Sequence, residues 1–109
     1  MIRAITLWQP WASAIAHCGK DVENRTWHPP AVAFGRDLLI HAGQRFDATA
    51  LEFMARIGER APASAPRGAV VAVARIGGCV EGHPGPGDRR SRWFGGPPGW
   101  IREDVRALA

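Results

Sequence analysis

A lysine, a glutamate and an arginine stand close together in the stretch HCGKDVENRTWHPP, residues 17–30. Lys20 is the only lysine among the 14 lysines and arginines, and Glu23 and Arg25 follow it three and five positions later. A carboxylate beside two cations stays ionised and orients them, and the cations can donate hydrogen bonds to an anion or to the edge of a base. The cluster therefore indicates a ligand site, with an exposed ion pair of little energetic worth as the alternative.

The residues around this cluster predict a helix followed by a short strand. Apolar residues recur at helical spacing over 9–18, with Pro10 in the first turn and Gly19 just past the end. Residues 21–25 alternate as a half-buried strand does, so the glutamate and the arginine of the cluster share one face. The lysine is then expected at the junction of helix and strand.

The rest of the chain predicts further strands and a second helix. The expected elements are strands at 36–42 and 68–81, a helix at 48–60 and a long loop at 82–99. Residues 1–7 should form a short strand or an extended lead-in, and residues 100–109 a strand in preference to a short helix. The Gly77-Gly78 pair predicts a bulge within its strand. Because the strands do not alternate with helices as regular βαβ units, we expect an α+β domain with a small mixed or antiparallel, barrel-like sheet.

The second helix has a predicted buried stripe and two possible starts. Leu51, Met54 and Ile57 recur at helical spacing and should face the core. Either Asp47 caps the helix, or Thr49 and Glu52 form a capping box.

Composition bounds the class of protein. A chain of 109 residues with 46% hydrophobic residues can form one domain with one modest core. The net charge of +4, carried by arginine, is compatible with nucleic acid and equally with the codon bias of a high-GC genome. No membrane span or signal peptide is visible, so no membrane partner and a cytoplasmic location are expected. Cys18 and Cys79 fit no metal-ligand spacing and should be reduced and buried.

The tryptophans divide into two groups. Trp8 and Trp11 belong to the first helix and its lead-in, where core packing is expected. Trp27 directly follows the charged cluster, and Trp93 stands in the Gly/Pro-rich loop beside several arginines. An aromatic ring beside arginines is typical of a platform on which bases stack, so Trp27 and Trp93 are candidate ligand contacts.

Three polar residues at the end of a strand could line the same cleft. They are His41, Gln44 and Arg45, in the stretch IHAGQR. A nucleophilic pair of Ser13 and His41 is disfavoured, because the apolar strand around the imidazole is more typical of a core histidine.

Four stretches of the chain together resemble the ASCH domain family of the PUA-like superfamily. They are LWQPWASAIAHCGKDVENRTW, LLIHAGQR, GAVVAVARI and WFGGPPGWIREDVRAL. The hallmark of that family is G-x-K-x-x-E-x-R after the first helix, and Lys20, Glu23 and Arg25 occupy its charged positions. Cys18 stands where the hallmark glycine would be, with Gly19 beside it.

The resemblance implies a PUA-like β-barrel flanked by two helices, with the charged cluster at the mouth of a cleft suited to RNA or a nucleotide. It covers nearly the whole chain, so a single domain over 1–109 is implied, with a last strand that is short or missing. The expected function is binding of RNA or a modified nucleoside in a basic cleft. The oligomeric state is not indicated.

Two hydrolase activities stay open as alternatives. One branch of the family resembles amidohydrolases of N4-acetylcytidine, in which a threonine nucleophile occupies the position of Glu23, so that nucleophile is missing here. Other members resemble binders of single-stranded RNA, some with metal-dependent ribonuclease activity. In an enzyme of that kind Lys20, Glu23 and Arg25 would be catalytic, and a divalent metal would be the cofactor. No carboxylate cluster in the sequence marks a metal site, and binding is the simpler hypothesis.

Overall fold

The structure is a computed structural model that describes the chain except for residues 1–2, 26–30, 63–64, 81–92, 94–98 and 109. Its elements, in chain order, are β1 (Arg3–Gln9), α1 (Trp11–His17), β2 (Val22–Asn24), the 3-10 helix η1 (Ala31–Ala33), β3 (Asp37–Phe46), α2 (Thr49–Arg56), β4 (Ala69–Val80) and β5 (Gly99–Ala107). The architecture is the mixed α+β fold that the sequence predicts, and each expected helix and strand overlaps an observed one.

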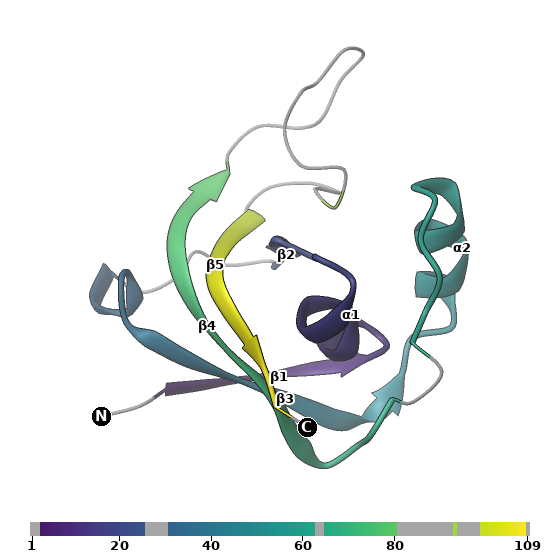
Figure 1. Ribbon diagram of the computed structural model, residues 1–109, viewed down its shortest axis with the longest axis horizontal. Coiled ribbons are helices and arrows are strands. Elements are labelled where there is room, and N and C mark those ends of the chain that lie inside the picture. The colour runs from purple at the N-terminus through teal and green to yellow at the C-terminus, as the bar shows by residue number, and fades with distance from the viewer. Residues whose placement is uncertain (1–2, 26–30, 63–64, 81–92, 94–98, 109) are drawn as a thin grey trace.

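Five strands form one sheet in the order β1-β3-β4-β5-β2. The β1–β3 pair is parallel, and the other three pairs are antiparallel. The sheet curls around α1, which lies against its concave face (Figure 1). Among the described residues no pairing joins the two edge strands, β1 and β2, so the sheet stays open there and the predicted barrel is not confirmed.

The predicted glycine bulge lies where the long strands bend. The register between β4 and β5 shifts between Ile76 and Gly78. A Cβ atom on Gly78 would lie 3.3 Å from Cδ1 of Ile101, so a larger side chain would crowd the partner strand. A bulge bends a strand and increases its twist, and this bend helps the sheet to wrap around α1.

The main core fills the concave face of the sheet. Along β1, Ile5, Leu7 and Gln9 are buried while the residues between them are exposed, as the two-residue period of a strand requires. Helix α1 buries Ala12 and Ile15 against them. Apolar side chains of β3, β4 and β5 complete this core: Leu38, Ile40, Ala42, Val71, Ala72, Ala74, Ile76 and Trp100.

Helix α2 packs at the side of the molecule, to the right of α1 in Figure 1. It buries Ala50 and Met54 completely, whereas Leu51 is 46% exposed and Ile57 is only half-buried. The predicted stripe is therefore wrong at Leu51. Residues four apart lie on one face of a helix, so the face that carries Ala50 and Met54 turns Leu51 outward.

Two further expectations have simple outcomes. Neither Cys18 nor Cys79 forms a disulfide, and both are half-buried rather than buried. Within the part of the chain that the structure describes, the helices are too short and too polar to cross a membrane.

Candidate functional site

A pocket of about 320 Å³ opens between the two edges of the sheet, where β1 and β2 do not pair. Its lining consists of Thr6, Leu7, Trp8, Trp11, Lys20, Glu23, Asn24, Arg25 and Asp47. The structure thus brings together the three residues of the predicted cluster, Lys20, Glu23 and Arg25, in one pocket. This pocket is small but within the range of small-molecule sites, which begins near 300 Å³.

Lys20 is buried at the wall of this pocket, with 1% of its surface exposed. Its Nζ donates hydrogen bonds to the backbone oxygen of Val22 and to Oε1 of Glu23, the latter at 3.1 Å. The ammonium also lies 5.5 Å from the centre of the Trp11 ring. The alternative of an exposed surface pair is therefore wrong, because a buried charge must be compensated by partners of this kind.

The chain reverses sharply to place this lysine. Gly19 follows α1 with φ +69°, in the left-handed region that favours glycine, as expected from its place just past the helix. The backbone N–H of Lys20 then donates to the oxygen of Ala14 at 3.3 Å, which holds the turn against the helix end. On the other side, pairing of Glu23 with Trp100 of β5 fixes the short strand that carries the glutamate.

Comparison with protein families identifies the family of this chain. The ASCH domain family matches the chain over residues 5–87, which include the whole charged cluster. The chain belongs to the ASCH domain family. The resemblance seen in the sequence is confirmed, and this family is generally linked to RNA binding. Comparison with curated proteins found no match.

Asp47 also lines the pocket between β1 and β2, although the sequence indicated it only as a possible helix cap. Its Oδ2 accepts a hydrogen bond from Nε1 of Trp11 at 2.9 Å, and its Oδ1 accepts from the backbone N–H of Thr49 at 3.0 Å and from the hydroxyl at 2.6 Å. The N-cap residue of α2 is Ala48, which makes no side-chain cap hydrogen bond, so neither predicted start is the observed one, and Asp47 lies one residue before the N-cap. The hydroxyl bond from Thr49, followed by the indole bond from Trp11, lowers the pKa of Asp47. The carboxylate therefore enters the pocket as a fixed negative charge.

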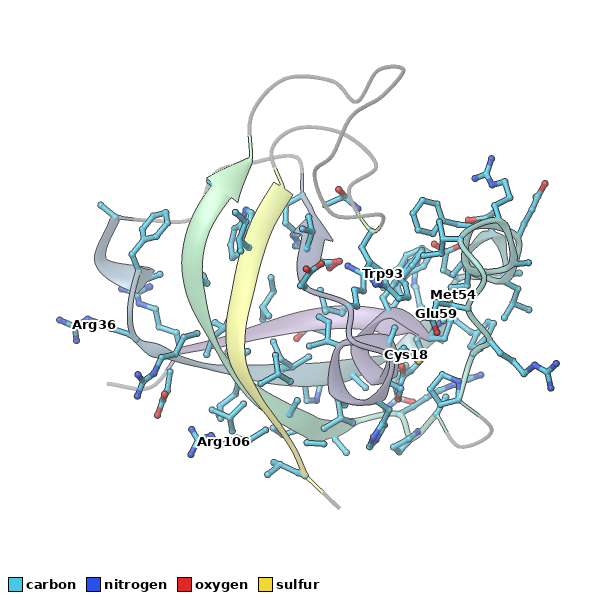
Figure 2. All side chains as sticks on the ribbon, turned by 45° about the horizontal axis from the view of Figure 1, so that its top comes forward. Cys18, Arg36, Met54, Glu59, Trp93 and Arg106 are labelled. Carbon is cyan, nitrogen blue, oxygen red and sulfur yellow. The ribbon has the colours of Figure 1, made fainter. Side chains whose placement is uncertain are left out.

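The charges of the described lining are balanced. Lys20 and Arg25 are cationic, and Glu23 and Asp47 are anionic. The expected basic cleft is therefore a pocket whose described charges, two positive and two negative, cancel. The net positive charge of this ASCH domain comes from arginines elsewhere in the sequence, such as Arg36 and Arg106, which lie away from the pocket (Figure 2).

The two tryptophans of the pocket differ in exposure. Trp11 is half-buried with its N–H bonded, close to what the sequence predicts. Trp8 is 47% exposed, so its predicted core position is wrong. It lies between Leu7 and Gln9, both of which turn inward, and alternation along β1 turns its indole outward. The guanidinium of Arg45 lies 5.3 Å from the Trp8 ring centre, which places this predicted contact at the rim of the pocket.

The other predicted polar contacts lie outside the lining. His41 is half-buried, and its Nδ1 lies 3.2 Å from the hydroxyl oxygen of Thr6. Gln44 is exposed near the start of β4, where its backbone oxygen accepts a bond from Arg67 at 3.5 Å. Ser13 is buried with its hydroxyl bonded by Nε2 of Gln9 at 2.8 Å, away from the imidazole, so the disfavoured serine–histidine pair is not formed.

The two tryptophans predicted as stacking platforms have different outcomes. Trp93 is 2% exposed and packs with Met54 beside α2 (Figure 2), so its ring offers no face for a base. Its backbone oxygen accepts a hydrogen bond from Nδ2 of Asn24 at 3.0 Å. Trp27 lies outside the described residues, as does almost all of the loop at 82–99.

Two further groups bear on possible chemistry. Burial, together with the negative charge of Glu59, raises the pKa of the Cys18 thiol, which disfavours the reactive thiolate. In the described ranges, no three His, Cys, Asp or Glu side chains are grouped so that they could hold a metal ion.

Proposed function

We propose that this ASCH domain binds single-stranded RNA and holds one unstacked base in the pocket between β1 and β2. The observation that carries the proposal is the meeting of Lys20, Glu23 and Arg25 with two indoles in one pocket of about 320 Å³. The link of the family to RNA supports the same conclusion.

The chemistry of the pocket matches the surface of a base. Carboxylate oxygens accept hydrogen bonds from exocyclic amines, and ammonium and guanidinium groups donate to carbonyl and ring-nitrogen acceptors. Aromatic side chains stack on the faces of unpaired bases, which is the usual way in which single-stranded RNA is recognised. The balanced charge of the lining fits a neutral polar ring better than it fits a phosphate alone.

The arginines at the rim suit the backbone of the same ligand. Arg25 lines the pocket, and Arg45 lies over the Trp8 ring at its edge. Guanidinium groups bind phosphate through paired hydrogen bonds. A base inside the pocket would thus be joined to phosphates that these arginines can contact.

We favour binding over hydrolysis because four of the described polar groups, Glu23, Asp47, Ser13 and Cys18, are poor nucleophiles or bases in their surroundings. Glu23 is engaged by Lys20, and the hydrogen bonds to Asp47 lower the pKa of its carboxyl group. The hydroxyl of Ser13 is buried away from the pocket, and the pKa of Cys18 is raised. A positioned base would need a pKa nearer to neutrality.

The test measures affinity for a fluorescent single-stranded RNA of mixed sequence by anisotropy at several salt concentrations. Because stacking of one base contributes about 1–3 kcal/mol, Trp8→Ala should weaken binding by about fivefold or more. Phe34→Ala is the matched control, since Phe34 is 40% exposed and lines neither this pocket nor the second pocket, which Arg3 and Trp100 line. Wild-type affinity in Trp8→Ala, or no RNA affinity at low salt, would overturn the proposal. Conversion of N4-acetylcytidine by the same protein would replace it with the amidohydrolase.

A further inference from the structure

A second pocket, of about 310 Å³, shares part of its lining with the first. It is lined by Arg3, Ala4, Ile5, Thr6, Arg25, Ala33, Leu38, Ile76 and Trp100. Two residues, Thr6 and Arg25, belong to both linings. The two pockets are therefore neighbours that meet at Thr6 and Arg25, and the two together are named the groove.

We infer that this groove holds two successive nucleotides of single-stranded RNA, one nucleoside in each pocket, with the phosphate that links them at Arg25. The inference rests on the proposed RNA-binding function and specifies the ligand of that site. The unit that the domain recognises is then a dinucleotide step.

The difference between the two pockets supports this assignment. The first pocket carries the buried Lys20–Glu23 pair and can read the polar edge of a base. The walls of the second pocket are mostly apolar core residues, including Ile5 and Trp100. Such walls can accept the face of a base or the sugar by shape, without selecting among its polar groups.

The positions of the two arginines also fit a dinucleotide. Arg25 lies at the junction of the pockets, and Arg3 is an exposed residue in the lining of the second only. A dinucleotide places its linking phosphate between its two nucleosides, and a longer strand places another phosphate beyond each of them. The two arginines thus stand where the groove would meet negative charge.

The test compares three sizes of ligand by isothermal titration calorimetry: cytidine, cytidine monophosphate and the dinucleotide pCpCp, which carries a phosphate at each end besides the linking one, with the A, G and U series in parallel. The monophosphate should bind more tightly than the nucleoside, and the dinucleotide should gain at least about fivefold over the monophosphate by filling the second pocket. The gain between dinucleotide and monophosphate is the quantity that decides the inference.

Three substitutions test whether the gain in affinity of the dinucleotide comes from the second pocket. Arg3→Gln changes a residue of the second pocket only and should weaken the dinucleotide while leaving the nucleoside unaffected. Ala33→Leu narrows the same pocket and should act in the same direction, with its folding checked by thermal unfolding. Arg36→Gln removes the same charge from an exposed residue that belongs to neither lining and should change the binding of neither ligand.

The outcomes separate this inference from the proposed function. Nucleosides that bind in a Trp8-dependent manner, with no gain for the dinucleotide or with a gain untouched by Arg3→Gln, would leave RNA-base binding intact and overturn the two-nucleotide groove. No binding of any ligand in any of the four series, together with no binding of longer RNA, would overturn both. A dinucleotide gain that is lost in Arg3→Gln and kept in Arg36→Gln supports the inference.

Discussion

Two clusters of ion pairs in this ASCH domain have similar geometry and opposite surroundings. Nζ of Lys20 lies 3.1 Å from Glu23, and the two side chains are 1% and 8% exposed. Asp37 lies 3.3 Å from Arg75 and 3.7 Å from Arg106, and these three side chains are 41–66% exposed. Water and salt screen the second cluster but hardly reach the first. The comparison teaches that separation alone does not tell which pair matters, because burial sets the cost of losing a partner.

The largest effect is expected from Lys20→Met. This change leaves Glu23 buried without its cation and should lower the free energy of unfolding by about 3–5 kcal/mol. Urea unfolding followed by circular dichroism measures it. The double variant Lys20→Met/Glu23→Gln should recover much of the loss, since the uncompensated charge is then gone. A single variant as stable as wild type would mean that the buried pair is not the feature that distinguishes the two clusters.

A smaller and pH-dependent effect is expected at Asp47, which stands between the two extremes of exposure. The pKa of Asp47 is lowered from its ordinary value of 3.8 by the hydrogen bonds from Thr49 and Trp11. A lowered pKa in the folded state gives stability that is present above the ordinary pKa and is lost as the pH falls through the folded value. Asp47→Asn should therefore cost about 1 kcal/mol at neutral pH.

Thermal unfolding of both proteins from pH 7 to pH 2 checks this sign. The difference between wild type and Asp47→Asn should be constant at neutral pH and should shrink as the pH falls below 3.8. A difference that grows in acid would contradict the lowered pKa. Thr49→Ala removes the hydroxyl that contributes most to the shift and should reproduce part of the effect.

The smallest effect is expected from Asp37→Asn in the exposed cluster. Both arginine pairs are lost, yet the free energy of unfolding should change by less than about 1 kcal/mol, because exposed pairs contribute little. Raising the salt concentration should reduce even this difference. A loss comparable to that of Lys20→Met would remove the distinction between the clusters.

Features set by neighbouring residues could be predicted from the sequence. The end of α1 just before Gly19 follows from the backbone freedom of glycine, and the register shift at Gly78 could be predicted from the Gly77-Gly78 pair. The charged motif itself could be found by spacing and by its resemblance to the ASCH family. Each of these signals is contained in a few consecutive residues.

Features set by distant residues could not be predicted. The bond between Trp11 and Asp47 joins positions 36 apart, and the bond between Asn24 and the Trp93 backbone joins positions 69 apart. The first bond holds the carboxylate of Asp47 in the pocket, where it was not expected. The second bond joins Asn24 to the backbone of Trp93, whose indole was expected at the surface and is buried. Similarly, Trp8 is exposed because alternation along β1 turns its indole outward, and which face of β1 is the inner one depends on the packing of the whole sheet.

The position of β5 has a consequence for any shortened form of this protein. The family match ends at residue 87, but β5 begins at Gly99 and lies between β4 and β2 in the sheet. A fragment cut at the limit of the match would lack β5, the strand that pairs with Val22, Glu23 and Asn24 of β2. The edge of β4 that pairs with β5 would then be left unpaired. The smallest unit that keeps Glu23 beside Lys20 must therefore extend through β5, well past residue 87.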